Sequence, residues 1–174
     1  MVTSSAEAPG ELETVRQFVN TVDLEEGRDE VGAWLEARGV RPTAEVIGRA
    51  VEVREAIRIL LARNNGLGVD VTDAAATLER AAGRAGLALR FAPDGSSRLE
   101  PEAAGADAVL GGLLVTVTGA MAEGTWERLK ACRSDACRWA FYDHAKNRSR
   151  TWCSMAVCGN RQKARAYRQR SGSR

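Results

Sequence analysis

Residues 132–170 read CRSDACRWAFYDHAKNRSRTWCSMAVCGNRQKARAYRQR, and they hold all four cysteines of the chain. Each pair, Cys132 with Cys137 and Cys153 with Cys158, has four residues between its members, and fifteen residues separate the pairs. Two turns that each present two thiolates can meet around one tetrahedral metal ion. Because Zn²⁺ accepts four thiolates at about 2.3 Å per sulfur, the spacing predicts one structural zinc per chain, bound by all four cysteines.

Other uses of the four cysteines remain open from the residues alone. Two disulfides would need an oxidising compartment, but residues 1–15 lack the basic and apolar regions of a secretory signal, so a cytoplasmic location is expected. An iron–sulfur cluster also takes four thiolates, although the C-x2-C spacing of many clusters is absent. His144 lies between the pairs, but four thiolates already complete the shell, and we expect it to be an exposed turn residue.

The formal net charge of +2 hides a sharp division of the chain. Residues 128–174 contain 13 Lys or Arg and 2 Asp or Glu, a net charge of +11. Residues 1–127 contain 12 basic and 21 acidic side chains, a net charge of −9. Such asymmetry predicts two functional units, of which the basic one suits a polyanion such as nucleic acid.

We expect an α+β protein with two domains, at 1–125 and 126–174. The first is mostly helical, because apolar residues recur at helical spacing, and it contains one β-hairpin where the period changes to two. Helices are expected over about 12–22, 29–38, 43–63, 71–82 and 107–123, and strands over 87–91 and 97–100. The uncharged run 108–122 is shorter than a membrane span and contains three glycines, so it indicates a core helix, and no membrane partner is expected.

The second domain is expected to be a small treble-clef-like zinc finger, made of a knuckle, a hairpin and a C-terminal helix. The hairpin is expected to run from residues 138–142 through a basic tip and to return at Thr151 and Trp152, before Cys153. Its aromatic side chains, Trp139, Phe141, Tyr142 and Trp152, could stack on unpaired bases or form a miniature core. Its basic side chains are the candidates for phosphate and base contacts, on a loop between the cysteine pairs and on the helix after them. These candidates are Lys146, Asn147, Arg148, Arg150, Asn160, Arg161, Lys163, Arg165, Arg168 and Arg170.

No catalytic constellation is visible in the sequence. Paired carboxylates such as Glu25 with Glu26 are typical of a solvated loop, and a chain with a single histidine offers few routes to a catalytic triad. Four thiolates would also leave zinc without the open position that catalytic zinc needs. We therefore expect a protein that is not an enzyme.

Four motifs of the finger are distinctive: WERLKAC (126–132), CRWAFYD (137–143), NRSRTWCSM (147–155) and CGNR (158–161). Together they resemble the CGNR zinc-finger family of bacterial proteins. The N-terminal part resembles the ABATE domain, the usual companion of that finger, through FVNTVD (18–23) and the helix that contains Trp34. The resemblance implies a stress-induced transcription regulator or an RNA-binding protein, with the four cysteines as zinc ligands and the finger as the nucleic-acid contact.

The function expected from these observations is zinc-dependent binding of nucleic acid, with the finger on DNA and the N-terminal domain sensing a small-molecule effector or a partner. RNA binding is an alternative. A second alternative is a zinc-clipped protein interaction module, whose basic finger docks on an acidic surface such as the −9 domain itself. A homodimer and a nucleoid location are further expectations.

Overall fold

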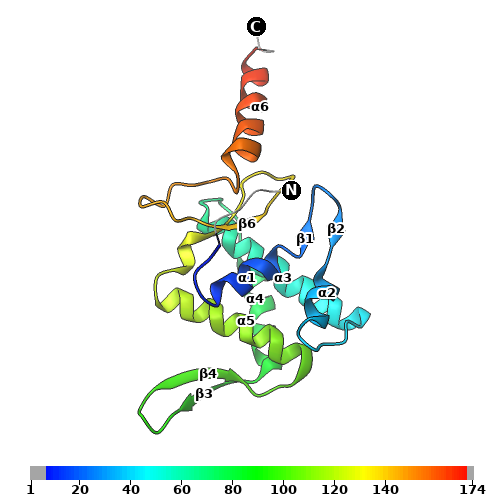
Figure 1. Ribbon diagram of the computed structural model, residues 1–174, viewed down its shortest axis with the longest axis vertical. Coiled ribbons are helices and arrows are strands. Elements are labelled where there is room, and N and C mark those ends of the chain that lie inside the picture. Colours follow the sequence, from blue (N-terminus) through cyan, green and yellow to red (C-terminus); the bar gives the residue numbers. More distant parts are fainter. Residues whose placement is uncertain (1–6, 172–174) are drawn as a thin grey trace.

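The computed structural model describes residues 7–171, without the side chains of Ala166, Arg170 and Ser171 (Figure 1). Its N-terminal part is a bundle of helices around α3, which contacts the helices before and after it and also the first strand of the finger. The expected helices and the expected hairpin are present. The helices are α1 (Leu12–Val19), α2 (Val31–Glu36), α3 (Ala44–Asn64), α4 (Thr72–Ala85) and α5 (Gly105–Ala122).

The central helix α3 begins and ends where the sequence predicts. The Thr43 hydroxyl accepts a hydrogen bond from the Val46 N–H at 3.3 Å, so it caps one of the free donors of the first turn. Along the helix, Val53, Ile57 and Leu61 are fully buried and form the stripe that the core surrounds. Gly66 follows with a φ of 72°, a left-handed conformation that glycine adopts without steric cost.

The first helix ends earlier than the apolar spacing predicts. Helix α1 stops at Val19, and Val22 lies instead in β1 (Val22–Asp23), which pairs with β2 (Arg28–Asp29). Local side-chain hydrogen bonds explain the difference. The Thr21 hydroxyl donates to the Phe18 carbonyl at 2.8 Å, and the Asp23 carboxylate accepts from the N–H groups of Glu25 and Glu26, which closes a turn.

Strands β3 (Leu87–Phe91) and β4 (Ser97–Pro101) form an antiparallel hairpin that projects from the bundle, and we call this hairpin the arm (Figure 1). Helix α5 follows it. By length and composition α5 could cross a membrane, but Leu110, Leu113 and Val117 are buried against the other helices. A helix in the core of a helical bundle has the same length and apolar composition, so these contacts agree with the core helix that the sequence predicts.

The finger contains the expected hairpin, but one of its two strands differs from the sequence-based prediction. Strand β6 (Ala140–Tyr142) was expected to pair with the segment before Cys153, but it pairs with β5 (Leu129–Ala131), so the first cysteine turn is the hairpin loop. The short helix η1 (Trp126–Arg128) leads into β5. After the second pair of cysteines, η2 (Met155–Gly159) continues into α6 (Asn160–Ser171), which extends away from the rest of the molecule (Figure 1).

One hydrophobic core spans the expected boundary at residues 125 and 126. Leu129, Ala140 and Tyr142 of the finger hairpin are buried in the same cluster as α1, α3 and α5. Because side chains alternate along a strand, Phe141 points to the other face and joins the cysteines in a second, smaller cluster. The hairpin β5–β6 therefore lies between the helical core and the cysteine site.

Candidate metal centre

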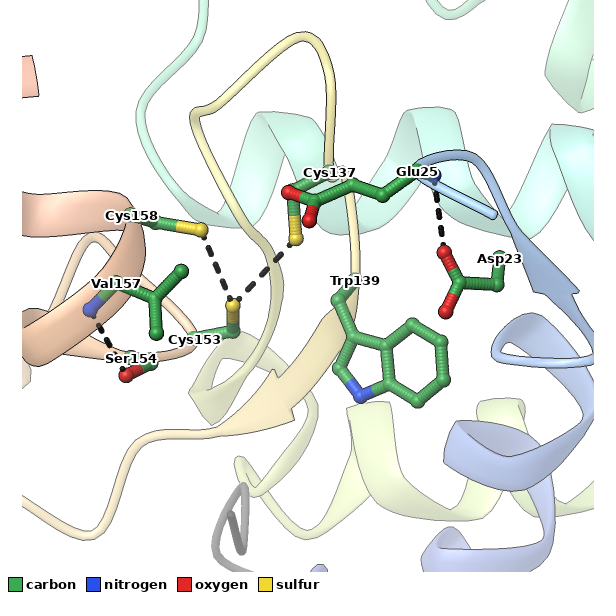
Figure 2. Close-up of a pocket in the computed structure, with 8 residues that line it drawn as sticks. All are labelled: Asp23, Glu25, Cys137, Trp139, Cys153, Ser154, Val157 and Cys158. Atoms are coloured by element: carbon green, nitrogen blue, oxygen red, sulfur yellow. Dashed lines mark hydrogen bonds between the residues drawn. The ribbon is translucent and has the colours of Figure 1, made fainter. Parts of the chain in front are cut away.

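The four cysteine sulfurs converge from two turns of the finger. Cys132 and Cys137 lie in the loop between β5 and β6, Cys153 precedes η2, and Cys158 lies within η2. All four Sγ atoms lie within 4.8 Å of one another, and Figure 2 shows three of them converging. The Sγ of Cys153 is 3.5 Å from that of Cys137 and 3.7 Å from that of Cys158.

These separations fit a metal ion and not disulfides. Four sulfurs placed tetrahedrally at about 2.3 Å from zinc are about 3.8 Å apart, close to the distances observed. A disulfide would need sulfurs about 2.05 Å apart, and all four cysteines are free. His144 is not part of the group, because its Nε2 lies 2.9 Å from the Glu7 carbonyl oxygen and its side chain is exposed. The donor set therefore fits one tetrahedral zinc ion bound by four cysteines.

The four neighbouring thiols cannot all ionise easily unless a cation lies between them. Hydrogen bonds from Cys137 and Cys153 lower the pKa of the Cys132 thiol to about 2. The same contact with Cys132 raises the pKa of Cys137 to about 12 and also raises the pKa of Cys153, while burial raises the pKa of Cys158. One thiolate is thus stabilised by its neighbours and three resist ionisation. A bound divalent ion supplies the positive charge that lets all four ionise.

Local backbone structure holds each pair of cysteines in place. In the first turn, the N–H groups of Cys137 and Arg138 both donate to the Ser134 carbonyl at 2.9 Å. In the second, the Ser154 hydroxyl accepts from the Val157 N–H at 3.3 Å and so caps η2. The Met155 side chain packs over Gly159, directly after Cys158, so a larger residue at this position would displace the Met155 sulfur.

Arg150 serves the metal centre from inside the finger. Its Nε donates to the Trp152 carbonyl at 2.9 Å, and its guanidinium also bonds to the carbonyl of Cys153. The guanidinium carbon lies 5.0 Å from the centre of the Phe141 ring. Arg150 is one of the candidates for nucleic-acid contact, but its guanidinium donates to the backbone of residues 152 and 153, and Cys153 is a zinc ligand.

A buried ion pair fixes the loop between the cysteine pairs. Lys130 Nζ lies 2.7 Å from the Asp143 carboxylate and also donates to the carbonyls of Arg148 and Arg150. The same carboxylate accepts from the backbone N–H groups of Ala145 and Arg150. Burial alone would raise the pKa of Asp143, but these hydrogen bonds outweigh it and hold the pKa below its ordinary value.

Polar side chains of the N-terminal part hold the finger hairpin by its backbone. The Asn20 amide pairs with both the N–H and the carbonyl of Ala140, at 2.7 and 2.9 Å. The buried Arg58 donates to the Val19 and Arg138 carbonyls. At the end of α3, the amides of Asn64 and Asn65 donate to four carbonyls of the finger and its approach, those of Trp126, Leu129, Ala131 and Thr151.

Sequence reasoning did not assign these roles. In the sequence, Asn64 and Asn65 look like ordinary residues at the end of a helix, and Lys130 and Asp143 count only as two charges of the finger. The one usable signal was Asn20, which lies within the FVNTVD motif of the ABATE resemblance. The amide contacts themselves depend on tertiary structure, because each joins residues more than sixty positions apart.

The remaining candidates for nucleic-acid contact lie in two places. Lys146, Asn147 and Arg148 are exposed on the loop before Arg150, where Arg148 pairs with Glu127 at 2.7 Å. Asn160 and Lys163 are exposed on α6, and the side chain of Arg170 lies outside the described part. The other three arginines share a groove of about 250 Å³ between α6 and the first cysteine turn. We call it the arginine groove, and its lining includes Ser134, Ala136, Arg161, Arg165 and Arg168.

The acidic hairpin β1–β2 reaches the same region from the N-terminal part. Asp23 and Glu25 line a small pocket beside Cys137 and Trp139 (Figure 2). The Glu25 carboxylate forms an ion pair with Arg161, the last residue of CGNR, and this contact raises the Arg161 pKa. One arginine of the groove is therefore engaged by an acidic residue of its own chain.

Comparison with protein families agrees with this arrangement. A family model described as "ABATE: Putative stress-induced transcription regulator" matches residues 13–128, well over half of the chain. The model described as "CGNR zinc finger" matches residues 128–171, which contain all four cysteines. A search of the curated proteins found no match. The chain belongs to the ABATE family and carries a C-terminal CGNR zinc finger that fits one structural zinc ion.

Proposed function

We propose that the protein is a zinc-dependent transcription regulator that binds the phosphate backbone of DNA in the arginine groove. The observation that carries this proposal is the convergence of Arg161, Arg165 and Arg168 on one groove beside the zinc site. Phosphate recognition needs cations held at fixed separation, and guanidinium groups bind phosphate oxygens in pairs. Because Cys158 lies in η2, which continues into α6, a bound zinc ion would fix the start of α6 and so the positions of these arginines.

The distribution of ion pairs supports a partner outside the chain. Within residues 7–171, no acidic side chain pairs with Arg165 or Arg168, and both are exposed. The finger docks on the N-terminal part mainly through amide-to-backbone hydrogen bonds and apolar packing, which leave these two arginines unused. The positive charges of Arg165 and Arg168 therefore remain available to a polyanion.

The rest of the proposal follows from the same site. Four thiolates complete the zinc shell and leave no position for a reacting water, which supports a binding role and not catalysis. Thiols that stay reduced favour a cytoplasmic location. The N-terminal part would sense an effector or partner. The resulting structural change would reach the finger through Asn20, Asn64 and Asn65, whose amides bond to the finger and its approach.

Binding measured against salt tests the proposal. Fluorescence polarisation with duplex DNA, single-stranded DNA and RNA should show an affinity that falls steeply between about 50 and 200 mM salt. An Arg165→Ala/Arg168→Ala variant should bind more weakly, and its logarithmic salt slope should be smaller by about 2. The matched control, Arg41→Ala/Arg63→Ala, makes the same charge change at exposed arginines of the N-terminal part and should retain the wild-type slope.

Two outcomes would count against the proposal. The first is the absence of binding to any of the three nucleic acids at low salt. The second is an Arg165→Ala/Arg168→Ala variant whose salt slope equals that of the wild type, because the groove would then contribute no phosphate contacts. A preference for RNA over duplex DNA would retain the groove but assign it a different nucleic acid.

A further inference from the structure

The arm carries an uncovered apolar face. Its register places Leu89 opposite Leu99 and Phe91 opposite Ser97, so these side chains project from the same face of the hairpin. The exposed fractions are 74% for Phe91, 55% for Leu89 and 37% for Leu99, which are high values for large apolar residues. A two-stranded hairpin with one apolar face in water is marginally stable unless something packs on it.

The charges of the arm lie on its opposite face and neutralise one another. Arg90 pairs with Glu102, and Arg98 pairs with Glu100. The apolar face, which runs from Leu87 and Pro101 to Phe91 and Ser97, contains no charged residue. A partner for this face therefore needs apolar surface and no compensating charge.

Helix α5 extends the apolar surface from the base of the arm. A Cβ on Gly111 would lie 3.3 Å from the Pro101 Cβ and 3.4 Å from the Leu87 Cδ2, so the apolar face of the arm packs against α5 at this glycine. By helical spacing, Val115, Thr118 and Ala122 follow Gly111 on the same face of α5. Val115 is half-buried, while Thr118 and Ala122 are exposed. The apolar face of the arm thus adjoins an α5 face whose residues Val115, Thr118 and Ala122 are uncharged.

We propose that this surface, formed by the arm and the α5 face after Gly111, docks on the same surface of a second copy of the chain. A twofold axis brings each residue of a patch near the patch of the partner, so a charged face would repel itself. This face is uncharged and can pair with itself. A second copy is also present whenever the protein is, which suits an arm that needs permanent cover.

The area involved shows why α5 must take part. The exposed parts of Leu89, Phe91 and Leu99 supply roughly 300 Å², whereas a stable interface buries about 800 Å² on each partner. The adjoining face of α5 is the neighbouring apolar surface that can supply more. The arm lies at the opposite end of the molecule from α6, so this dimer leaves both arginine grooves open (Figure 1).

Analytical ultracentrifugation of the full-length zinc-loaded protein tests the proposal. The wild type should sediment as a concentration-dependent dimer, and Phe91→Glu should weaken the dimer by at least about 30-fold, because a buried aromatic anchor gives way to a charge. Thr118→Glu, on the exposed face of α5, should also weaken it. The matched control is Arg90→Ala, which changes the net charge by the same amount on the opposite face of the arm and should dimerise as the wild type does.

Two results would overturn the dimer. They are a wild type that stays monomeric at about 100 μM and a Phe91→Glu variant that dimerises as tightly as the wild type. If the monomeric wild type also pelleted with phospholipid vesicles, the apolar face would be assigned to a lipid surface instead. Phe91 is largely exposed, so its substitution should leave folding and zinc content unchanged, and circular dichroism and metal analysis check this. Failure here would leave the nucleic-acid proposal intact, since the salt slope of the monomer is measured separately.

Discussion

Asn20, directly after α1, forms two hydrogen bonds with the backbone of Ala140, the first residue of β6, 120 positions further along the chain. The amide oxygen accepts from the Ala140 N–H at 2.7 Å, and the amide nitrogen donates to its carbonyl at 2.9 Å. An amide side chain carries a donor and an acceptor side by side, so it can satisfy the backbone N–H and carbonyl of one residue together. This contact joins the family motif of the N-terminal part to the strand that supports the metal centre.

Asn20→Ala should destabilise the protein by about 2 to 4 kcal/mol. The substitution leaves both polar groups of Ala140, a fully buried residue, without their partners. Urea unfolding measures the loss. Asn147→Ala removes an amide from an exposed loop and should change the free energy of unfolding by less than about 0.5 kcal/mol. Equal effects of the two substitutions would show that the Asn20 contact is not a significant part of the docking.

Asp143→Asn should destabilise the protein by about 3 to 5 kcal/mol, because it leaves the Lys130 ammonium buried without a counter-charge. The control is Glu127→Gln, which breaks an exposed ion pair with Arg148 in the same finger and should cost less than about 1 kcal/mol. A Lys130→Met/Asp143→Leu variant should be more stable than Asp143→Asn. If it is less stable, the hydrogen bonds of Asp143 to the loop backbone matter more than the charge pair.

The same pair predicts a dependence on pH. The pKa of Asp143 is lowered in the folded protein, so its contribution is present above the unfolded value of about 3.9 and is lost as the pH falls through the folded value. The stability difference between wild type and Asp143→Asn should stay constant from about pH 7 to 5 and shrink below about pH 4. Because acid also protonates zinc thiolates, the two proteins are compared at each pH, and a difference that grows in acid would contradict the assignment.

Metal analysis should find about one zinc per chain, and Cys153→Ser should lose it, whereas the control Ser149→Ala in the same finger should retain it. Chelation should have a local effect, because β5 and β6 are buried in the helical core and do not depend on the metal alone. Hydrogen exchange should therefore speed up at residues 153–159 and much less at 129–131. Full zinc retention by Cys153→Ser would rule out four-cysteine coordination.

Periodicity and spacing were sufficient for the elements whose determinants are local. The apolar stripe and cap of α3, the arm and the four-cysteine quartet are all readable from neighbouring residues. The pairing of β6 with β5 was not, because Ala140 and Tyr142 choose their partner by packing on helices distant in sequence. Nor can a sequence distinguish an arginine that faces solvent, such as Arg165, from one such as Arg150, whose donors bind carbonyls of its own finger.

The ion pair between Glu25 and Arg161 leads to a prediction about affinity. In the proposed complex, phosphate competes with the Glu25 carboxylate for the same guanidinium, so the acidic hairpin partly blocks the arginine groove. Glu25→Gln removes the competing charge, and it should raise affinity for duplex DNA. Since both side chains are substantially exposed, the gain should be about twofold to fivefold and should diminish as salt rises.

Glu26→Gln provides the control, because it makes the same charge change one residue away, where the carboxylate pairs with Arg28 and not with the groove. Fluorescence polarisation at low salt should therefore distinguish the two variants. A general reduction of negative charge would raise affinity equally in both, whereas a direct competition would raise it only in Glu25→Gln. Loss of the gain when Glu25→Gln is combined with Arg161→Ala would assign the effect to this pair, since the carboxylate would then have no guanidinium to withhold.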